Sequence, residues 1–146
     1  MFVVKSPKRL TSIIQLNELK ERDATKALGD RVQQLELNKK RLSDLESYRL
    51  EYGRNILGEG RGLTASKLQD YQTFLNNLNY AVEQQKTAIK QLVVEYENAK
   101  RQWLAARNRS KAIQTVQKKY ELMESIEEGR REQREQDDRN NSKNNR

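Results

Sequence analysis

The fold of this 146-residue chain is decided by one stretch, residues 68–120, which has the sequence LQDYQTFLNNLNYAVEQQKTAIKQLVVEYENAKRQWLAARNRSKAIQTVQKKY. Its apolar residues recur at alternating spacings of three and four. One set contains Leu68, Leu75, Val82, Ile89, Tyr96, Trp103, Ser110 and Gln117. The other contains Tyr71, Leu78, Gln85, Leu92, Ala99, Ala106, Ile113 and Tyr120. A period of 3.5 residues sustained this far predicts a coiled-coil seam rather than a helix lying on a globular core.

A second helix is predicted before this stretch, over residues 10–57, which lack proline and are rich in good helix formers. Its seam is less regular. Steps of seven give Leu28, Leu35, Leu42, Arg49 and Ile56, and the companion positions are Ala24, Arg31, Asn38, Leu45 and Tyr52. The first helix therefore supplies the partner stripe, with polar interruptions at Arg31, Asn38 and Arg49.

Glycines separate the two helices: four of the six in the chain are Gly53, Gly58, Gly60 and Gly62. They predict a turn over residues 58–65, followed by a helix over about 66–128 that is capped by Thr64 or Ser66. The expected fold is all-α, a long two-helix antiparallel coiled-coil hairpin over residues 1–128, whose second arm extends past the first. Residues 129–146 contain no apolar side chain, so we expect a disordered charged tail.

Composition narrows the function. The chain has neither cysteine nor histidine, which removes thiol and imidazole catalysis, disulfides and the usual zinc ligands. A two-helix hairpin also offers no concave site in which carboxylates could be tuned for catalysis. The N-terminal apolar run, Phe2 to Val4, is too short for a signal peptide or a membrane span. We therefore expect a soluble, non-enzymatic protein with no cofactor and no metal.

Basic residues are concentrated in a stretch without acidic residues, from Asn98 to Tyr120, although the whole chain carries only +8. The stretch contains Lys100, Arg101, Arg107, Arg109, Lys111, Lys118 and Lys119. In a hairpin it lies near the N-terminal Lys5, Lys8 and Arg9, so the open end is expected to be positive. Such a surface suits an acidic protein or a nucleic acid; the alternative is a solvated helix face without a partner.

Two aromatic residues fall outside the seam pattern. Tyr48 and Phe74 each precede a seam position by one residue, and the hairpin brings them to a similar height together with Tyr52 and Leu78. Partly exposed aromatic rings of this kind are enriched at protein interfaces. The alternative is that these rings only widen the seam, and a purely structural spacer would not need them.

Residues 45–52 (LESYRLEY), the glycine turn and residues 68–85 (LQDYQTFLNNLNYAVEQQ) closely resemble the FliJ family of flagellar export proteins. The shared pattern is a tyrosine followed four residues later by another, the turn, and a tyrosine followed three residues later by phenylalanine. These features go beyond what a coiled coil requires. With the length, helical character and charged tail, the resemblance spans nearly the whole chain.

The resemblance implies a component of the bacterial flagellar type III export apparatus, cytoplasmic and peripheral at the inner membrane, with only indirect membrane contact. Family members link the hexameric export ATPase to the cytoplasmic domain of the export gate protein and help to recycle export chaperones. The implied gate-binding surface contains Leu45, Tyr48, Tyr52, Phe74, Leu78 and Ala81, flanked by Arg41 and Gln85. The basic open end is the expected ATPase-binding surface. The alternative is a basic helical hairpin that binds nucleic acid, although no nucleic-acid partner is expected here.

Overall fold

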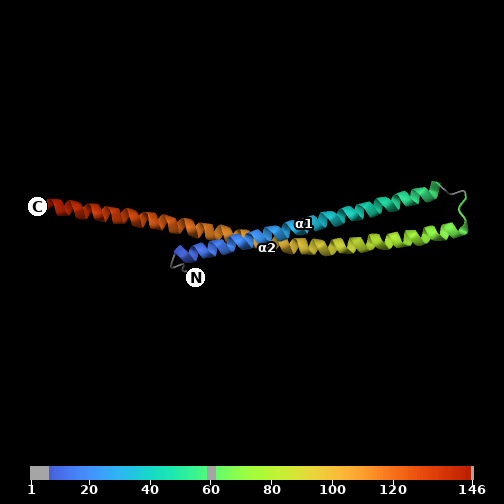
Figure 1. Ribbon diagram of the computed structural model, residues 1–146, viewed down its shortest axis with the longest axis horizontal. Helices are drawn as coiled ribbons and strands as arrows, with labels where there is room; N and C mark the ends of the chain where they lie inside the picture. The colour runs from blue at the N-terminus through green and yellow to red at the C-terminus, as the bar shows by residue number, and fades with distance from the viewer. Residues whose placement is uncertain (1–6, 59–61, 146) are drawn as a thin grey trace. The chain divides into compact units, whose positions relative to one another are not determined.

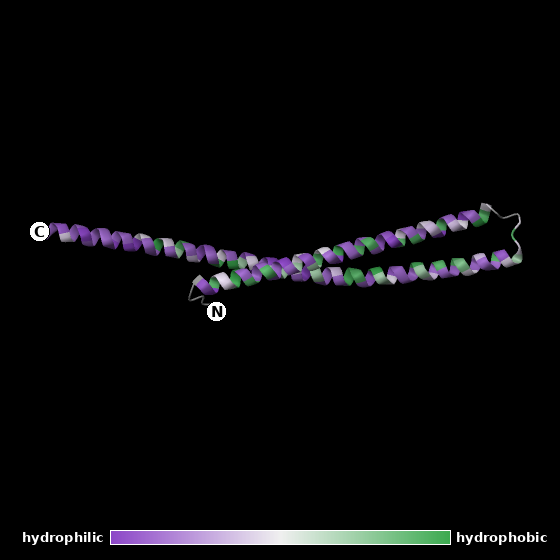
Figure 2. Cartoon of the chain, in the orientation of Figure 1, coloured by the Kyte–Doolittle hydropathy of each residue, from purple (hydrophilic) through white to green (hydrophobic). Residues whose placement is uncertain are grey.

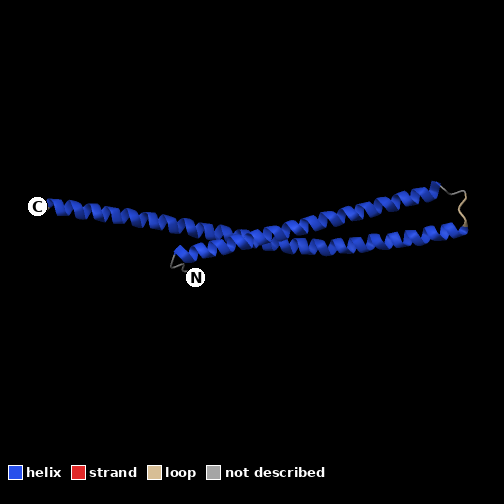
Figure 3. Ribbon diagram, in the orientation of Figure 1, coloured by secondary structure: helices blue, strands red, loops and turns tan. Residues whose placement is uncertain are grey.

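The computed structural model describes residues 7–58 and 62–145. Within these residues there are two helices and no strand: α1, Pro7–Gly58, has 52 residues, and α2, Ala65–Asn144, has 80. Figure 3 shows helix along almost the whole described chain. The prediction of an all-α protein made of two long helices that pack on each other is confirmed.

The contacts divide the chain into two units. The turn-side unit comprises residues 23–103, where α1 and α2 lie side by side (Figure 1). The terminal unit comprises residues 1–22 and 104–146, where the first turns of α1 pack on α2. Both units are built from the same two helices, and each has its own stretch of seam.

The α2 seam is confirmed at all predicted positions except one. Fifteen of the sixteen residues are buried or half-buried, and Val82 is completely inaccessible to solvent. Leu68 was wrongly placed in the seam, since it lies in the first turn of α2 and is exposed. At the opposite end of the turn, Leu57 is exposed and Gly58 has no side chain, so α1 offers little to cover Leu68.

The α1 seam is confirmed at all ten predicted positions, none of which is exposed. It also begins earlier than predicted, with the same alternation of three and four residues. The additional positions are Leu10, Ile14, Asn17 and Glu21. In Figure 2 apolar and hydrophilic residues alternate along both helices, as expected for narrow apolar stripes.

The polar interruptions of the α1 seam meet polar partners on α2. The Gln85 side-chain amide donates to Asn38 Oδ1 at 2.8 Å and to the Asn38 carbonyl oxygen at 3.0 Å. Arg31 Nη1 donates to Glu95 Oε2 at 2.8 Å. Arg49 Nη1 donates to Asn79 Oδ1 at 3.3 Å.

These polar contacts fix the register of the turn-side unit. A helix shifted by one heptad would place Leu78 or Leu92 opposite Asn38 in place of Gln85, which removes the hydrogen bonds between the two amides. The ion pair of Arg31 and Glu95 is about one-third exposed, so its contribution to stability is small. The ion pair contributes mainly to specificity, because any other register of α1 against α2 would separate Arg31 from Glu95.

The structure describes only part of the turn between α1 and α2. Residues 59–61, including Gly60, lie outside the described residues. Gly62 has a φ of +138°, a backbone conformation that favours glycine. Thr64 caps α2: its Oγ1 accepts a hydrogen bond from the Lys67 N–H at 3.2 Å, and its carbonyl accepts one from the Leu68 N–H at 3.0 Å. Of the two predicted caps, Thr64 is therefore correct.

The expected disorder of residues 129–146 differs from the structure. Helix α2 continues to Asn144, although every side chain described from residue 121 onward is exposed. The absence of apolar residues correctly indicated that the segment packs on nothing. It does not forbid a helix, because arginine, glutamate and glutamine are good helix formers and the segment continues an existing helix, which avoids the cost of nucleation.

We expect Leu35→Ala to lower the free energy of unfolding by about 2–4 kcal/mol, because it leaves a cavity in the seam. Leu35 is only 7% exposed. Leu37→Ala is the matched control, since Leu37 is on the same helix and 50% exposed. Urea denaturation followed by circular dichroism measures both. Equal losses in the two variants would contradict the assignment of the seam.

Candidate protein-binding surfaces

Four aromatic rings gather on the turn-side unit, two from each helix. Tyr52 is at the centre: its ring centroid lies 4.3 Å from that of Phe74, 5.0 Å from that of Tyr71 and 6.3 Å from that of Tyr48. Tyr48 and Phe74 meet edge to face at 6.0 Å. These separations are in the range in which aromatic pairs attract one another.

The four rings differ in their access to solvent. Tyr52 and Tyr71 are half-buried, whereas Tyr48 is 49% exposed and Phe74 is 36% exposed. The inner pair therefore supports the outer pair, which presents apolar ring surface to solvent. A supported aromatic pair loses little conformational entropy when a partner covers it, and this property suits an interface.

The other predicted members of this surface are placed differently. Leu45, a seam residue of α1, and Ala81, beside the seam of α2, are both half-buried. Leu78 is only 7% exposed, so it belongs to the seam and supports the surface from below. The seam pattern placed Leu45, Tyr52 and Leu78 in the seam and Tyr48 and Phe74 outside it, and the burial of these residues agrees with that pattern.

A shallow hollow of about 500 Å³ adjoins the rings and is lined by Arg41, Asp44, Leu45, Tyr48 and Gln85. The flanking residues Arg41 and Gln85 thus share one surface with Tyr48. Gln85 is held in place by its hydrogen bonds to Asn38. The hollow adds a polar rim to the aromatic pair, the arrangement typical of protein interfaces.

The ring cluster raises the pKa of the Tyr52 phenol above its ordinary value. Partial removal from water is the main cause, because it disfavours the charged phenolate. The neighbouring Tyr48 and Asp70 add a smaller electrostatic effect in the same direction. The neutral phenol is therefore the form that the folded cluster favours.

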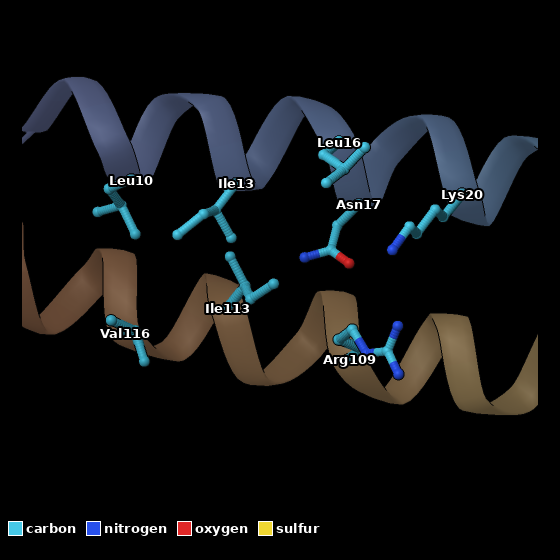
Figure 4. A pocket seen from close by; sticks show the side chains of 8 residues that line it. All are labelled: Leu10, Ile13, Leu16, Asn17, Lys20, Arg109, Ile113 and Val116. Carbon is cyan, nitrogen blue, oxygen red and sulfur yellow. The ribbon is translucent and has the colours of Figure 1, made fainter. Parts of the chain in front are cut away.

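The terminal unit carries an apolar groove between α1 and α2 (Figure 4). Its volume is about 460 Å³. The lining consists of Leu10, Ile13, Leu16, Asn17 and Lys20 of α1 with Arg109, Ile113 and Val116 of α2. Leu10 and Val116 lie at one end in the figure, and the cationic Lys20 and Arg109 lie at the other.

Next to this groove the seam is polar. Asn17 and Ser110 are both buried, and within the described residues Ser110 Oγ has no hydrogen-bond partner. A hollow of about 80 Å³ lies beside them. A buried hydroxyl without a partner lowers stability, so the seam of the terminal unit is locally less favourable than the apolar layers elsewhere.

The seven predicted basic residues are all exposed. Lys100 and Arg101 belong to the turn-side unit, and the other five belong to the terminal unit. Lys8 and Arg9 are exposed at the start of α1 in the terminal unit, whereas Lys5 lies outside the described residues. The basic stretch therefore faces solvent, but only five of its seven cations lie in the terminal unit.

Three features were missed from the sequence. Tyr71 was assigned only to the seam, although its position one turn before Phe74 was a signal for the ring cluster. Asp44 was not considered, although it lies one turn after Arg41. The groove of the terminal unit was missed because the regular α1 seam was taken to begin at Ala24, and the pattern of Leu10, Ile14, Asn17 and Glu21 went unused.

Over residues 7–58 and 62–145, histidine, cysteine and carboxylate side chains form no group of three that could hold a metal ion. Neither helix, over its described length, has a segment apolar enough to cross a bilayer.

Comparison with known proteins gives the same family as the resemblance seen in the sequence. The family described as "Flagellar FliJ protein" matches residues 6–146. The chain is 26% identical over 130 residues to the flagellar FliJ protein of Salmonella typhi and 25% identical over 130 residues to that of Escherichia coli (strain K12). Each alignment covers 88% of this chain and 88% of the relative.

Stability should depend on the ionisation of Tyr52 at alkaline pH. Because folding raises its pKa, the unfolded chain ionises first. The stabilisation that the neutral Tyr52 phenol contributes is fully present below about pH 10, the pKa of tyrosine in the unfolded chain. It is lost as the pH rises through the higher pKa that Tyr52 has in the folded protein. Thermal melts should show a steeper alkaline loss for the wild type than for Tyr52→Phe, which keeps the ring; parallel curves would contradict this.

Proposed function

Because the chain belongs to the FliJ family of flagellar proteins, we propose that it links the hexameric export ATPase to the cytoplasmic domain of the export gate protein. Family membership supports a place in the flagellar export apparatus. The observation that carries the finer proposal is the exposed pair Tyr48 and Phe74, supported from below by two further rings. A purely structural spacer would not need such an exposed aromatic surface.

The gate-binding surface is proposed to centre on Tyr48 and Phe74. Leu45 and Ala81 extend it along the two helices, and Tyr52 and Leu78 hold it from below. The adjoining hollow, with Arg41 and Asp44 on its rim, gives the partner polar groups to recognise. Central aromatic residues with a polar rim are the usual source of binding energy and specificity in such interfaces.

The ATPase-binding surface is proposed to be the basic side chains. It consists of Lys100, Arg101, Arg107, Arg109, Lys111, Lys118 and Lys119. Exposed charges of one sign steer an acidic partner and set specificity more than they add affinity. The same positive charge supports the alternative of nucleic-acid binding. Four of the basic residues recur at spacings of seven and four and therefore share one face of α2: Lys100, Arg107, Lys111 and Lys118. Binding measurements have to separate the two candidates.

The remaining parts of the proposal rest on membership of the FliJ family. The protein acts without chemistry of its own, assists the recycling of export chaperones, and works in the cytoplasm at the inner-membrane export apparatus, where contact with the membrane is indirect. The two units carry different surfaces, aromatic in one and mainly basic in the other, and this difference supports two separate protein partners.

We expect the double variant Tyr48→Ala with Phe74→Ala to lose at least about tenfold in affinity for the gate domain, because each ring is a central anchor. Far-ultraviolet circular dichroism should be unchanged, since alanine favours helix. Isothermal titration with the purified gate domain measures the affinity, and motility in soft agar measures export.

The matched control is Tyr80→Ala. Tyr80 is an exposed aromatic residue on α2, six residues after Phe74, and it takes no part in the ring cluster. Gate affinity should stay within about twofold for this variant. Unchanged affinity in the double variant, or an equal loss in the control, would exclude this surface.

Reversal of three basic charges should weaken binding to the export ATPase. Lys111→Glu, Lys118→Glu and Lys119→Glu together should slow association and remove most of its salt dependence. The control is Lys39→Glu with Lys40→Glu, two exposed cations on α1 in the turn-side unit. Surface plasmon resonance at several salt concentrations gives the rates.

The same measurement separates the two candidate functions. A generic DNA duplex and a generic RNA duplex are injected over the same surface at moderate salt. Tight, steeply salt-dependent binding to either, combined with no binding to the ATPase, would favour the nucleic-acid alternative. Weak binding to both duplexes and strong binding to the ATPase supports the proposal.

A further inference from the structure

One segment of α2 in the terminal unit has exposed apolar side chains. Residues 121–128, ELMESIEE, expose Leu122, Met123 and Ile126, with Met123 67% exposed. Glutamates surround these residues at positions 121, 124, 127 and 128. In the described residues nothing covers them, because every side chain from residue 121 to 145 is exposed. The segment is thus an acidic amphipathic helix face without a partner.

The groove of the same unit has complementary properties. Its walls are apolar, formed by Leu10, Ile13 and Leu16 on one side and Ile113 and Val116 on the other (Figure 4). Its charged lining residues are cationic, Lys20 and Arg109. An apolar groove with a positive end is suited to an amphipathic helix that carries glutamates.

The groove and the acidic segment cannot meet within one molecule. Both lie on the continuous helix α2, where Met123 follows Val116 by two turns, a rise of about 10 Å along the same axis. A helix cannot fold back onto its own neighbouring turns. The complementary segment on this groove must therefore come from another chain.

We propose that this face binds a second copy of the chain in an antiparallel, two-fold symmetric arrangement. Placing Met123 of one copy opposite Val116 of the other also places Val116 of the first opposite Met123 of the second. One contact thus fills both grooves, as a self-complementary interface requires.

The charges agree with this arrangement. The same antiparallel register brings Glu127 within one helical turn of Arg109 of the other copy, and in Figure 4 Lys20 lies at the same end of the groove as Arg109. Ile126 then lies near Ile113 of the other copy. A parallel arrangement would lack this symmetry, because it could not fill both grooves at once.

Sedimentation equilibrium of the purified full-length chain tests the proposal without any export partner, so its outcome is separate from that of the proposed function. We expect a monomer–dimer equilibrium. Met123→Glu with Ile126→Glu should weaken the dimer at least about tenfold, because apolar burial is lost and like charges are added. Val94→Glu, at an exposed α2 position in the turn-side unit, should leave the dimer unchanged.

Charge exchange tests the register. Arg109→Glu alone and Glu127→Arg alone should each weaken the dimer, and the double variant should restore it. Because the chain has no cysteine, single cysteines report proximity cleanly. A mixture of the Val116→Cys and Met123→Cys chains should form a mixed disulfide, whereas a mixture of Val94→Cys and Met123→Cys should not.

Three outcomes would overturn the inference. The first is a monomer at every concentration. The second is a dimer that is insensitive to the changes at positions 123 and 126. The third is a monomer whose binding to the export ATPase or a chaperone depends on Met123, which would assign the acidic segment to that protein instead.

Discussion

The narrow seam between α1 and α2 is the constraint on which the rest of the structure depends. In the described residues no third layer covers the two helices, so every buried side chain lies at one of the alternating positions. Because the seam is a single layer of side chains, few other contacts can compensate for the loss of one seam contact. Its polar positions must find polar partners across the helix pair, as Asn38 does with Gln85 and Arg31 with Glu95.

The same thinness determines where function can reside. Most side chains one position away from the seam are already exposed, so a binding surface has to be supported by seam residues rather than by a deep core. The ring cluster illustrates this arrangement, since Tyr52 and Tyr71 from the two seams support Tyr48 and Phe74.

The two units use one architecture for different surfaces. The turn-side unit has the aromatic pair and the hollow beside it. The terminal unit has an apolar groove, most of the basic side chains and an acidic apolar segment. Its seam is also weaker, because Asn17 and Ser110 occupy buried positions and Ser110 Oγ is without a partner. A helix pair therefore gains distinct surfaces by varying the positions beside a constant seam.

The sequence by itself determined the two helices, the turn and the seam, because a 3.5-residue period and a cluster of glycines are local properties of the chain. It also located the six residues of the proposed gate surface in one region. Only the tertiary structure decided that Tyr71 joins the rings and that Tyr52 contacts all three of the others. It also decided that Leu68 lies beyond the end of the seam. Periodicity gives the face of one helix on which a residue lies, whereas exposure depends on the side chain that the other helix places opposite it.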